Sequence, residues 1–211
     1  VSKGETLYSI SWRYGLNYRD LARHNNIPSN YTIFPGQRLA LDVGNPKKPR
    51  IRTARQTKNT SHANRATERS KSQTKAPSVK KTTVRTRGPF QWRWPVEGKL
   101  LKGFSGGSGL NKGIDIIAEL GEAVHSTAPG LVVYAGRGLR GYGNLLIIKH
   151  DDRYLSAYAH GRKLLVKEGD SIKAGQKIAE VGSSGTDRTK LHFEIRRDGK
   201  PVDPQQYLPK R

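Results

Sequence analysis

The chain has 211 residues, enough for one or two domains. It contains no cysteine, which excludes a disulfide framework, a cysteine nucleophile and any zinc site built on thiolates. Lysine and arginine number 39 against 17 aspartate and glutamate residues, a formal charge of +22, of which +13 lies in residues 43–88. Such a charge often indicates a nucleic-acid partner, but no recognition element accompanies it, so we expect no nucleic-acid binding.

Residues 1–42 have the pattern of a small βααβ unit. A first helix is predicted between Thr6, a residue type that caps helices, and Gly15, which suits a helix end. Asn17 can cap a second helix, and residues 38–41 read as a short strand. The side chains expected on the inward side of the first helix are Leu7, Ile10 and Tyr14.

Residues 43–88 are predicted to be a basic, disordered linker. From residue 44 to residue 88 the only large apolar side chains are Ile51, Val79 and Val84. This is too little apolar surface to offset the entropy of ordering the chain. The charge fits either a solvated, self-repelling tether or attraction to an anionic membrane surface.

Residues 89–211 are predicted to be an antiparallel, all-β domain. Short apolar runs alternate with glycine-containing turns, a rhythm typical of such folds. The runs include residues 131–134, 145–148 and 154–158, and the turns fall at residues 141–144, 173–175 and 183–185. The fold class expected for the whole chain is therefore mostly β, with a small α+β module at the N-terminal end.

The first unit carries a set of motifs that resembles a known domain. They are Gly4-Glu5-Thr6-Leu7, Ile10, Tyr14-Gly15, Leu21, Asn25-Asn26 and Pro35-Gly36-Gln37-Arg38-Leu39. Together they make residues 1–42 similar to a LysM domain, a family that binds N-acetylglucosamine-containing glycans such as peptidoglycan. The resemblance implies a glycan groove lined by Gly4, Glu5, Thr6, Leu7, Asn30, Ile33 and Pro35. The same Gly4 and Thr6 also suit a purely structural role at the start of a helix.

A second set of motifs runs from residue 94 to residue 208. It includes Asn111-Lys112-Gly113-Ile114-Asp115, Tyr158-Ala159-His160, Gly175-Gln176-Lys177-Ile178, Gly182-Ser183-Ser184-Gly185, Leu191-His192-Phe193-Glu194 and Asp203-Pro204. This set resembles the LytM-type peptidases, the M23 family of zinc endopeptidases. An active member holds zinc through a His and an Asp four residues apart and the second His of a His-x-His pair, assisted by two further histidines. Carried over, the ligand positions are Asn111, Asp115 and His192, and the assisting positions are His160 and Lys190.

Two of these five positions are altered, and both changes act against a metal. An amide such as Asn111 is a much poorer zinc ligand than an imidazole, and Lys190 would place a positive charge beside the ion. A catalytic zinc needs about three protein ligands and a water, so we predict no metal, no cofactor and an inactive homologue of a zinc metallopeptidase. Lys190 is expected to pair with Asp115. His150, at a strand end, is expected to be hydrogen-bonded within the sheet and not a ligand.

The combination of a LysM-like module, a basic linker and a degenerate LytM-like domain resembles the NlpD family of outer-membrane lipoproteins of Gram-negative bacteria. The resemblance implies a non-catalytic activator of periplasmic N-acetylmuramoyl-L-alanine amidases, which split septal peptidoglycan for daughter-cell separation. It also implies a location on the periplasmic side of the outer membrane, at the division septum, with a lipid anchor upstream of Val1.

We expect the altered cleft to bind a segment of the amidase. Its expected contact residues are Asn111, Asp115, His160, Arg188, Lys190 and His192. Changed polar groups such as Lys190 suit an acidic partner. Two other functions are compatible with the same residues. One is an active M23-type zinc endopeptidase with an atypical site, and the other is a passive protein that anchors the envelope to peptidoglycan.

Overall fold

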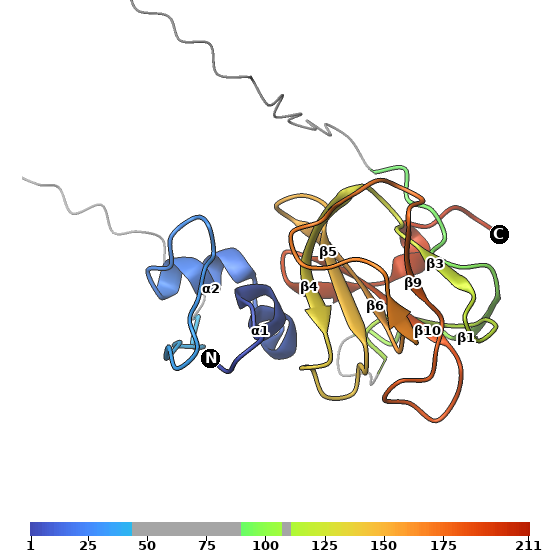
Figure 1. The fold of residues 1–211 in the computed structure, drawn as a ribbon. Helices are drawn as coiled ribbons and strands as arrows, with labels where there is room; N and C mark the ends of the chain where they lie inside the picture. The colour runs from blue at the N-terminus through green and yellow to red at the C-terminus, as the bar shows by residue number, and fades with distance from the viewer. Residues whose placement is uncertain (44–89, 107–110) are drawn as a thin grey trace, which may run out of the picture. The chain divides into compact units, whose positions relative to one another are not determined.

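The computed structural model describes residues 1–43, 90–106 and 111–211, which are coloured in Figure 1. Residues 1–43 belong to the same structural unit as the residues from 90 onward. The predicted linker, residues 43–88, lies outside the described residues except for Val43. Within the described parts of the chain, no helix has the length and apolar character needed to cross a membrane.

The first module, residues 1–42, begins with a short capped helix. α1 (Leu7–Tyr14) starts after Thr6, whose side chain accepts a hydrogen bond from the Ser9 amide at 3.1 Å. The Ser9 hydroxyl accepts in return from the Thr6 amide at 2.9 Å, so two amides at the helix start are satisfied. The helix ends at Gly15, whose φ of 66° is favourable for a residue without a Cβ atom. The predicted start and stop of this helix are confirmed.

A second helix packs on the first. α2 (Tyr18–His24) is capped by Asn17, whose side chain accepts from the Arg19 amide at 2.9 Å, as the sequence predicts. The buried residues of the module's own core are Leu7, Ile10, Leu21, Ala22 and Ile27. A core this small makes the module dependent on its caps and on every apolar contact it can form.

Two details of the first module differ from the prediction. Tyr14 does not join the inward side of α1: it is 52% exposed, whereas Trp12 is buried. Neither of the two strands of the predicted βααβ unit forms, because residues 1–6 and residues 38–41 contain no strand. For residues 38–41, the reason is that the side chain of Asn25 binds both the amide and the carbonyl of Ala40, at 2.7 and 2.8 Å. This side chain takes the place of a neighbouring strand as the hydrogen-bond partner.

The second domain, residues 89–211, consists of two antiparallel sheets, which confirms the predicted fold class. In the large sheet the strand order is β1-β2-β10-β6-β5-β4-β8, with β11 paired to β10. Its strands are β1 (Lys99–Lys102), β2 (Ile114–Ile117), β4 (Gly130–Gly136), β5 (Leu145–Lys149), β6 (Tyr154–Ala159), β8 (Ser171–Ile172), β10 (Leu191–Arg197) and β11 (Lys200–Val202). The small sheet has the order β3-β9-β7, with β3 (Ala123–His125), β9 (Lys177–Glu180) and β7 (Lys163–Leu164). A short 3-10 turn, η1 (Pro204–Gln206), follows β11. Figure 1 shows β4, β5 and β6 side by side.

The central strands of the large sheet, β5, β6 and β10, are buried on both faces. Side chains alternate between the two faces of a strand, so Leu146 and Ile148 of β5 enter the main core, while Leu145 and Ile147 point the other way. We call this second side the outer face. Its apolar residues are Val133, Leu145, Ile147, Leu155, Ala157 and Ala159. On β10 the same alternation sends residues 191, 193 and 195 into the main core and leaves residues 192, 194 and 196 for the outer face.

His150, directly after β5, is hydrogen-bonded within the fold, as the sequence predicts. Its Nδ1 lies 2.8 Å from the Pro129 carbonyl, which can only accept, so Nδ1 carries the proton. Its Nε2 lies 2.7 Å from the Ser156 hydroxyl. Burial lowers the pKa of His150 to about 4. The ring is therefore neutral at pH 7 and has a structural role.

This buried neutral histidine makes stability fall as the pH falls. Below about pH 6.5 the unfolded chain takes up a proton at His150 that the folded chain refuses until about pH 4. We expect the free energy of unfolding to drop by about 1.5 kcal/mol between pH 6.5 and pH 5. Urea unfolding at both pH values measures this, with the His150→Asn variant as the control. An equal drop in that variant would assign the pH dependence to other groups.

Candidate functional site

The altered M23 positions come together in a cleft at one end of the outer face, with a volume of about 340 Å³. β2 supplies Asp115 and β10 supplies His192, and these two residues are direct cross-strand partners. Lys190 lies just before β10, and His160 follows β6 with a φ of 66°. The lining is Lys102, Asn111, Lys112, Asp115, Gly141, Tyr142, His160, Lys190, His192 and Glu194. All five positions carried over from the M23 pattern therefore share one cavity.

Asp115, which is 5% exposed, binds two cationic side chains. The Lys190 Nζ donates to its Oδ2 at 2.8 Å, and the His192 Nδ1 donates to its Oδ1 at 2.6 Å. Burial alone would raise the pKa of this carboxyl group, but the hydrogen bonds and charges of the two partners outweigh burial and lower it to about 2. The predicted pair of Lys190 and Asp115 is confirmed.

His192 has both ring nitrogens engaged by carboxylates. Nδ1 faces Asp115, and Nε2 lies 3.1 Å from Oε1 of Glu194. Burial opposes a charge here, but the hydrogen bonds and charges of the two carboxylates raise the pKa of His192 to about 9. The ring is therefore an imidazolium at neutral pH, and both of its N–H groups donate.

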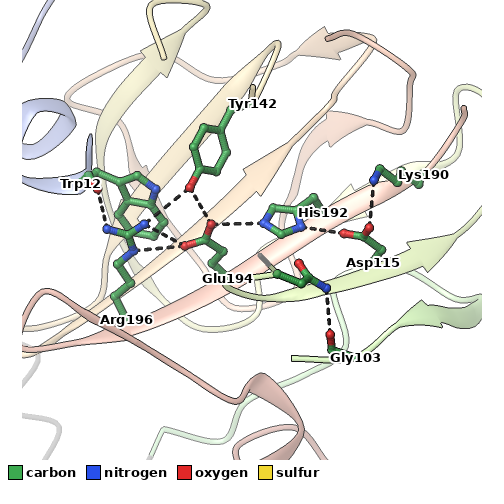
Figure 2. A network of polar contacts seen from close by, with 9 residues as sticks. Trp12, Gly103, Asp115, Tyr142, Lys190, His192, Glu194 and Arg196 are labelled. Atoms are coloured by element: carbon green, nitrogen blue, oxygen red, sulfur yellow. Dashed lines mark hydrogen bonds and ion pairs between the residues drawn. The ribbon is translucent and has the colours of Figure 1, made fainter. Parts of the chain in front are cut away.

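Glu194 and Arg196 extend this pattern along β10, as Figure 2 shows. Glu194 is fully buried, accepts from the Tyr142 hydroxyl at 2.7 Å and lies 3.0 Å from the Arg196 guanidinium. Arg196 donates to the backbone carbonyl of Trp12 at 2.6 Å and lies 3.7 Å from the centre of its ring. Five side chains of alternating charge thus form a continuous series, which we call the polar chain: Lys190, Asp115, His192, Glu194 and Arg196.

Two predicted cleft residues, Asn111 and His160, are held by backbone carbonyls. The Asn111 amide donates to the carbonyl of Gly103 at 2.8 Å. Nδ1 of His160 donates to the Ser184 carbonyl at 2.9 Å. Burial, together with the charges of His192 and of the lysine beside it, lowers the pKa of His160, so this ring is neutral at pH 7.

Arg188, the remaining predicted cleft residue, lies at the rim. Its side chain is 59% exposed and pairs with Asp187 at 3.3 Å. It lines an adjoining pocket together with Leu101, Lys102, Asp115, Asp187 and Lys190. Because Asp115 and Lys190 line both cavities, the rim is continuous with the cleft.

These residues do not fit a zinc ion. The Asn111 amide, at the first ligand position, donates to the carbonyl of Gly103, and an amide is a much poorer zinc ligand than an imidazole. Both oxygens of Asp115 already accept hydrogen bonds, one of them from the ammonium group of Lys190 at 2.8 Å. In the parts of the chain that the structure describes, no group of three or more His, Cys, Asp or Glu side chains has the arrangement of a metal site.

The residues predicted to bind glycan lie in different surroundings. Gly4, Glu5 and Thr6 line a second cavity of about 510 Å³, whose other wall is Ala135, Leu164, Val166, Lys167 and Glu168. Leu7 is fully buried in the core of the first module, so its side chain cannot cover a sugar ring, and that part of the prediction is wrong. The three remaining predicted residues keep some exposed surface: Asn30, Ile33 and Pro35.

Sequence reasoning missed three residues of the site, Glu194, Arg196 and Tyr142. The first two follow His192 at intervals of two, the spacing that places side chains on one face of a strand. That spacing is the signal that could have found them. Tyr142 comes from the turn before β5, and its contact with Glu194 joins segments 52 residues apart.

Comparison with known proteins gives a family for each folded part. Residues 1–42 match the LysM domain, and residues 109–204 match peptidase family M23. Over its whole length the chain is 46% identical to the "Lipoprotein NlpD/LppB homolog" of Pseudomonas aeruginosa, of which it covers 76%. It is 41% identical to the "Murein hydrolase activator NlpD" of Escherichia coli, of which it covers 67%.

Among solved structures, a zinc-containing peptidase from Vibrio cholerae is similar to the second domain. The two share 32% sequence identity and a TM-score of 0.53, over 57% of this chain and 41% of that one. The combination of LysM and M23 domains and the similarity over the full length identify the family of this chain. The chain belongs to the NlpD family.

Proposed function

We propose that this protein is a non-catalytic activator of periplasmic N-acetylmuramoyl-L-alanine amidases, which split septal peptidoglycan so that daughter cells separate. The observation that carries the proposal is the contact of the Lys190 ammonium group with Asp115, which puts a positive charge at the metal position of an M23 fold. Relatives that match the whole chain are named murein hydrolase activators, which supports the same function.

The charge of the cleft supports an acidic partner segment. Its lining contains four cationic side chains, Lys102, Lys112, Lys190 and His192, against two carboxylates. Both carboxylates, Asp115 and Glu194, are already engaged inside the polar chain. An acidic segment of an amidase would therefore meet a positive field, which favours fast association and excludes basic partners.

The other parts of the chain would hold this activator at the peptidoglycan and at the outer membrane. The LysM module would hold peptidoglycan glycan strands, and relatives named as outer-membrane lipoproteins support a location at the periplasmic side of that membrane. The basic sequence of residues 43–88 would add attraction to an anionic membrane surface.

The direct test mixes the purified protein with amidases of the same organism and follows dye release from labelled peptidoglycan sacculi. We expect strong release only when both proteins are present. Release by this protein alone, abolished by a chelator, would identify a working zinc endopeptidase instead. Co-sedimentation with sacculi without any effect on an amidase would leave a passive anchor of the envelope.

A matched pair of variants locates the contact surface. Arg188 and Arg197 are both exposed and both pair with a neighbouring aspartate, but Arg188 lies at the cleft rim and Arg197 does not line the cleft. We expect Arg188→Glu to lower amidase activation roughly three- to tenfold, because a rim charge of the right sign becomes repulsive. Arg197→Glu should match the wild type in the same dye-release assay. Equal loss in both variants would argue against docking at the cleft.

A further inference from the structure

The outer face of the large sheet is one surface that extends from the cleft into an apolar area. The β10 residues His192, Glu194 and Arg196 are cross-strand partners of Ala159, Ala157 and Leu155 of β6. Ala157 is in turn the partner of Ile147 on β5, and Ile147 is the partner of Tyr134 on β4. Cross-strand partners lie on the same side of a sheet, so the polar chain and the apolar residues adjoin each other.

Two aromatic residues of the first module cover this apolar area. Trp12 and Tyr18 are 2% and 3% exposed. Both pack with the apolar residues of the outer face, and neither belongs to the module's own core around Leu7 and Leu21. The first module therefore buries a surface of the second domain and retains a separate core of its own.

Polar contacts accompany this apolar contact. The Thr6 hydroxyl donates to the carbonyl of Val133 at 3.3 Å, and Arg19 forms an ion pair with Asp152. Thr6 is also one of the residues predicted to bind glycan, so docking of the module occupies a hydroxyl group from that set. These contacts involve few side chains.

The first module also covers Arg196, the last residue of the polar chain. Arg196 is 1% exposed because the ring of Trp12 lies over its guanidinium, and the Trp12 carbonyl accepts one of its hydrogen bonds. Figure 2 shows this end of the series beside the Tyr142 and Glu194 contacts. Removal of the module would expose both Arg196 and the apolar residues next to it.

We propose that the first module is a displaceable cover on the partner-binding surface of the second domain, and that the activator works with this surface uncovered. The inference rests on the proposed function. Specific protein interfaces have an apolar, desolvated centre with a polar rim. The cleft is small and its lining is mainly polar, so it supplies a rim and not a centre. The apolar surface that continues from it lies beneath Trp12 and Tyr18.

One feature of the contact favours release. The indole N–H of Trp12 is buried and, although the Tyr142 hydroxyl lies close to it, it completes no hydrogen bond among the described residues. A buried donor without a partner opposes the docked state, because water satisfies this group once the module leaves. Since Trp12 is not part of the module's own core, the module keeps that core when it separates.

The test crosslinks the first module to the second domain so that it cannot separate. The chain has no cysteine, so Arg19→Cys with Asp152→Cys introduces the only two thiols, one on each side of the contact. A short, reducible bis-methanethiosulfonate reagent then links them. We expect the linked protein to activate the amidase at least about tenfold less than the unlinked double variant, with activation restored by a reductant.

A second pair of cysteines controls for the effect of the crosslinking reaction itself. Arg153 and Asp198 form an ion pair within the second domain, at 3.0 Å, so linking Arg153→Cys to Asp198→Cys adds the same crosslink without joining the module to the sheet. This protein should activate equally before and after reduction. Full activation by the locked Arg19/Asp152 protein overturns the proposal. So does failure of that pair to crosslink under conditions in which the control pair does.

The opposite change releases the cover. Trp12→Ala removes the aromatic contact and leaves the module's own core untouched. We expect at least threefold more activation at subsaturating activator concentration, and unchanged or lower activation counts against the proposal. If the wild type activates no amidase while binding sacculi, the proposed function itself fails and this inference fails with it.

Discussion

Glu194→Gln is expected to lower the free energy of unfolding by about 3–5 kcal/mol, a large part of the stability of an ordinary domain. Glu194 is fully buried between two cations, His192 and Arg196, and also accepts from the Tyr142 hydroxyl. A glutamine keeps the size of the side chain and removes its charge. The Arg196 guanidinium then remains buried without a carboxylate partner, while His192 keeps only Asp115, and desolvation of a buried charge without a partner is costly.

Urea unfolding followed by tryptophan fluorescence measures this loss. The matched control is Glu97→Gln, because Glu97 also pairs with an arginine but has a side chain that is 92% exposed. Ion pairs in such a position contribute little, so this control should change stability by less than about 0.5 kcal/mol. A loss below about 1 kcal/mol for Glu194→Gln would mean that the buried series is not needed for folding and that its charges can be replaced without penalty.

The sequence predicts those features that depend on local chemistry. The helix boundaries follow from Thr6, Gly15 and Asn17, because caps act on amides only a few residues away. The contact between Lys190 and Asp115 follows from the M23 motifs, since a lysine in place of a histidine falls beside the carboxylate that remains. The antiparallel fold follows from the rhythm of apolar runs and turns.

Burial of β10 on both faces could not be predicted from its own pattern. Apolar residues at 191, 193 and 195 alternate with His192, Glu194 and Arg196, and this alternation is typical of a strand with one face in water. The polar face is buried because Trp12, about 180 residues earlier in the chain, lies on it. Nothing in the sequence near β10 indicates that contact.

The first module also contains contacts that its local sequence pattern does not reveal. Spacing along α1 assigned Tyr14 to the inward side with Leu7, whereas Trp12 is the aromatic residue that is buried. A helix with apolar residues on two sides has two packing partners, and periodicity alone cannot tell which aromatic meets which partner. For residues 38–41, the side chain of Asn25 competes for backbone groups that a strand would use, and propensity does not register such competition.

The double variant Asn111→His with Lys190→His is expected to bind zinc at least about 100-fold more tightly than the wild type. The two substitutions restore the imidazoles that the M23 pattern has at these positions and remove the ammonium group that now contacts Asp115. Metal binding would also displace the proton that holds His192 between its two carboxylates, so the affinity should rise with pH. Asn111→His adds a zinc ligand and Lys190→His adds an assisting group, and groups around a metal typically contribute 10- to 100-fold each.

Titration calorimetry at pH 7 and pH 8 measures the affinity, and cleavage of crosslinked muropeptides gives a second reading. Lys190→Gln is the control, because it removes the positive charge without adding a ligand, and it should gain far less affinity than the double variant. If the wild type itself retains zinc tightly after desalting, the hydrogen bonds of His192 and Asp115 are not what keeps metal out. Weak binding by the double variant has a different meaning. It would place the barrier in the polar chain behind the cleft, where Glu194 holds His192 as a donor whatever occupies positions 111 and 190.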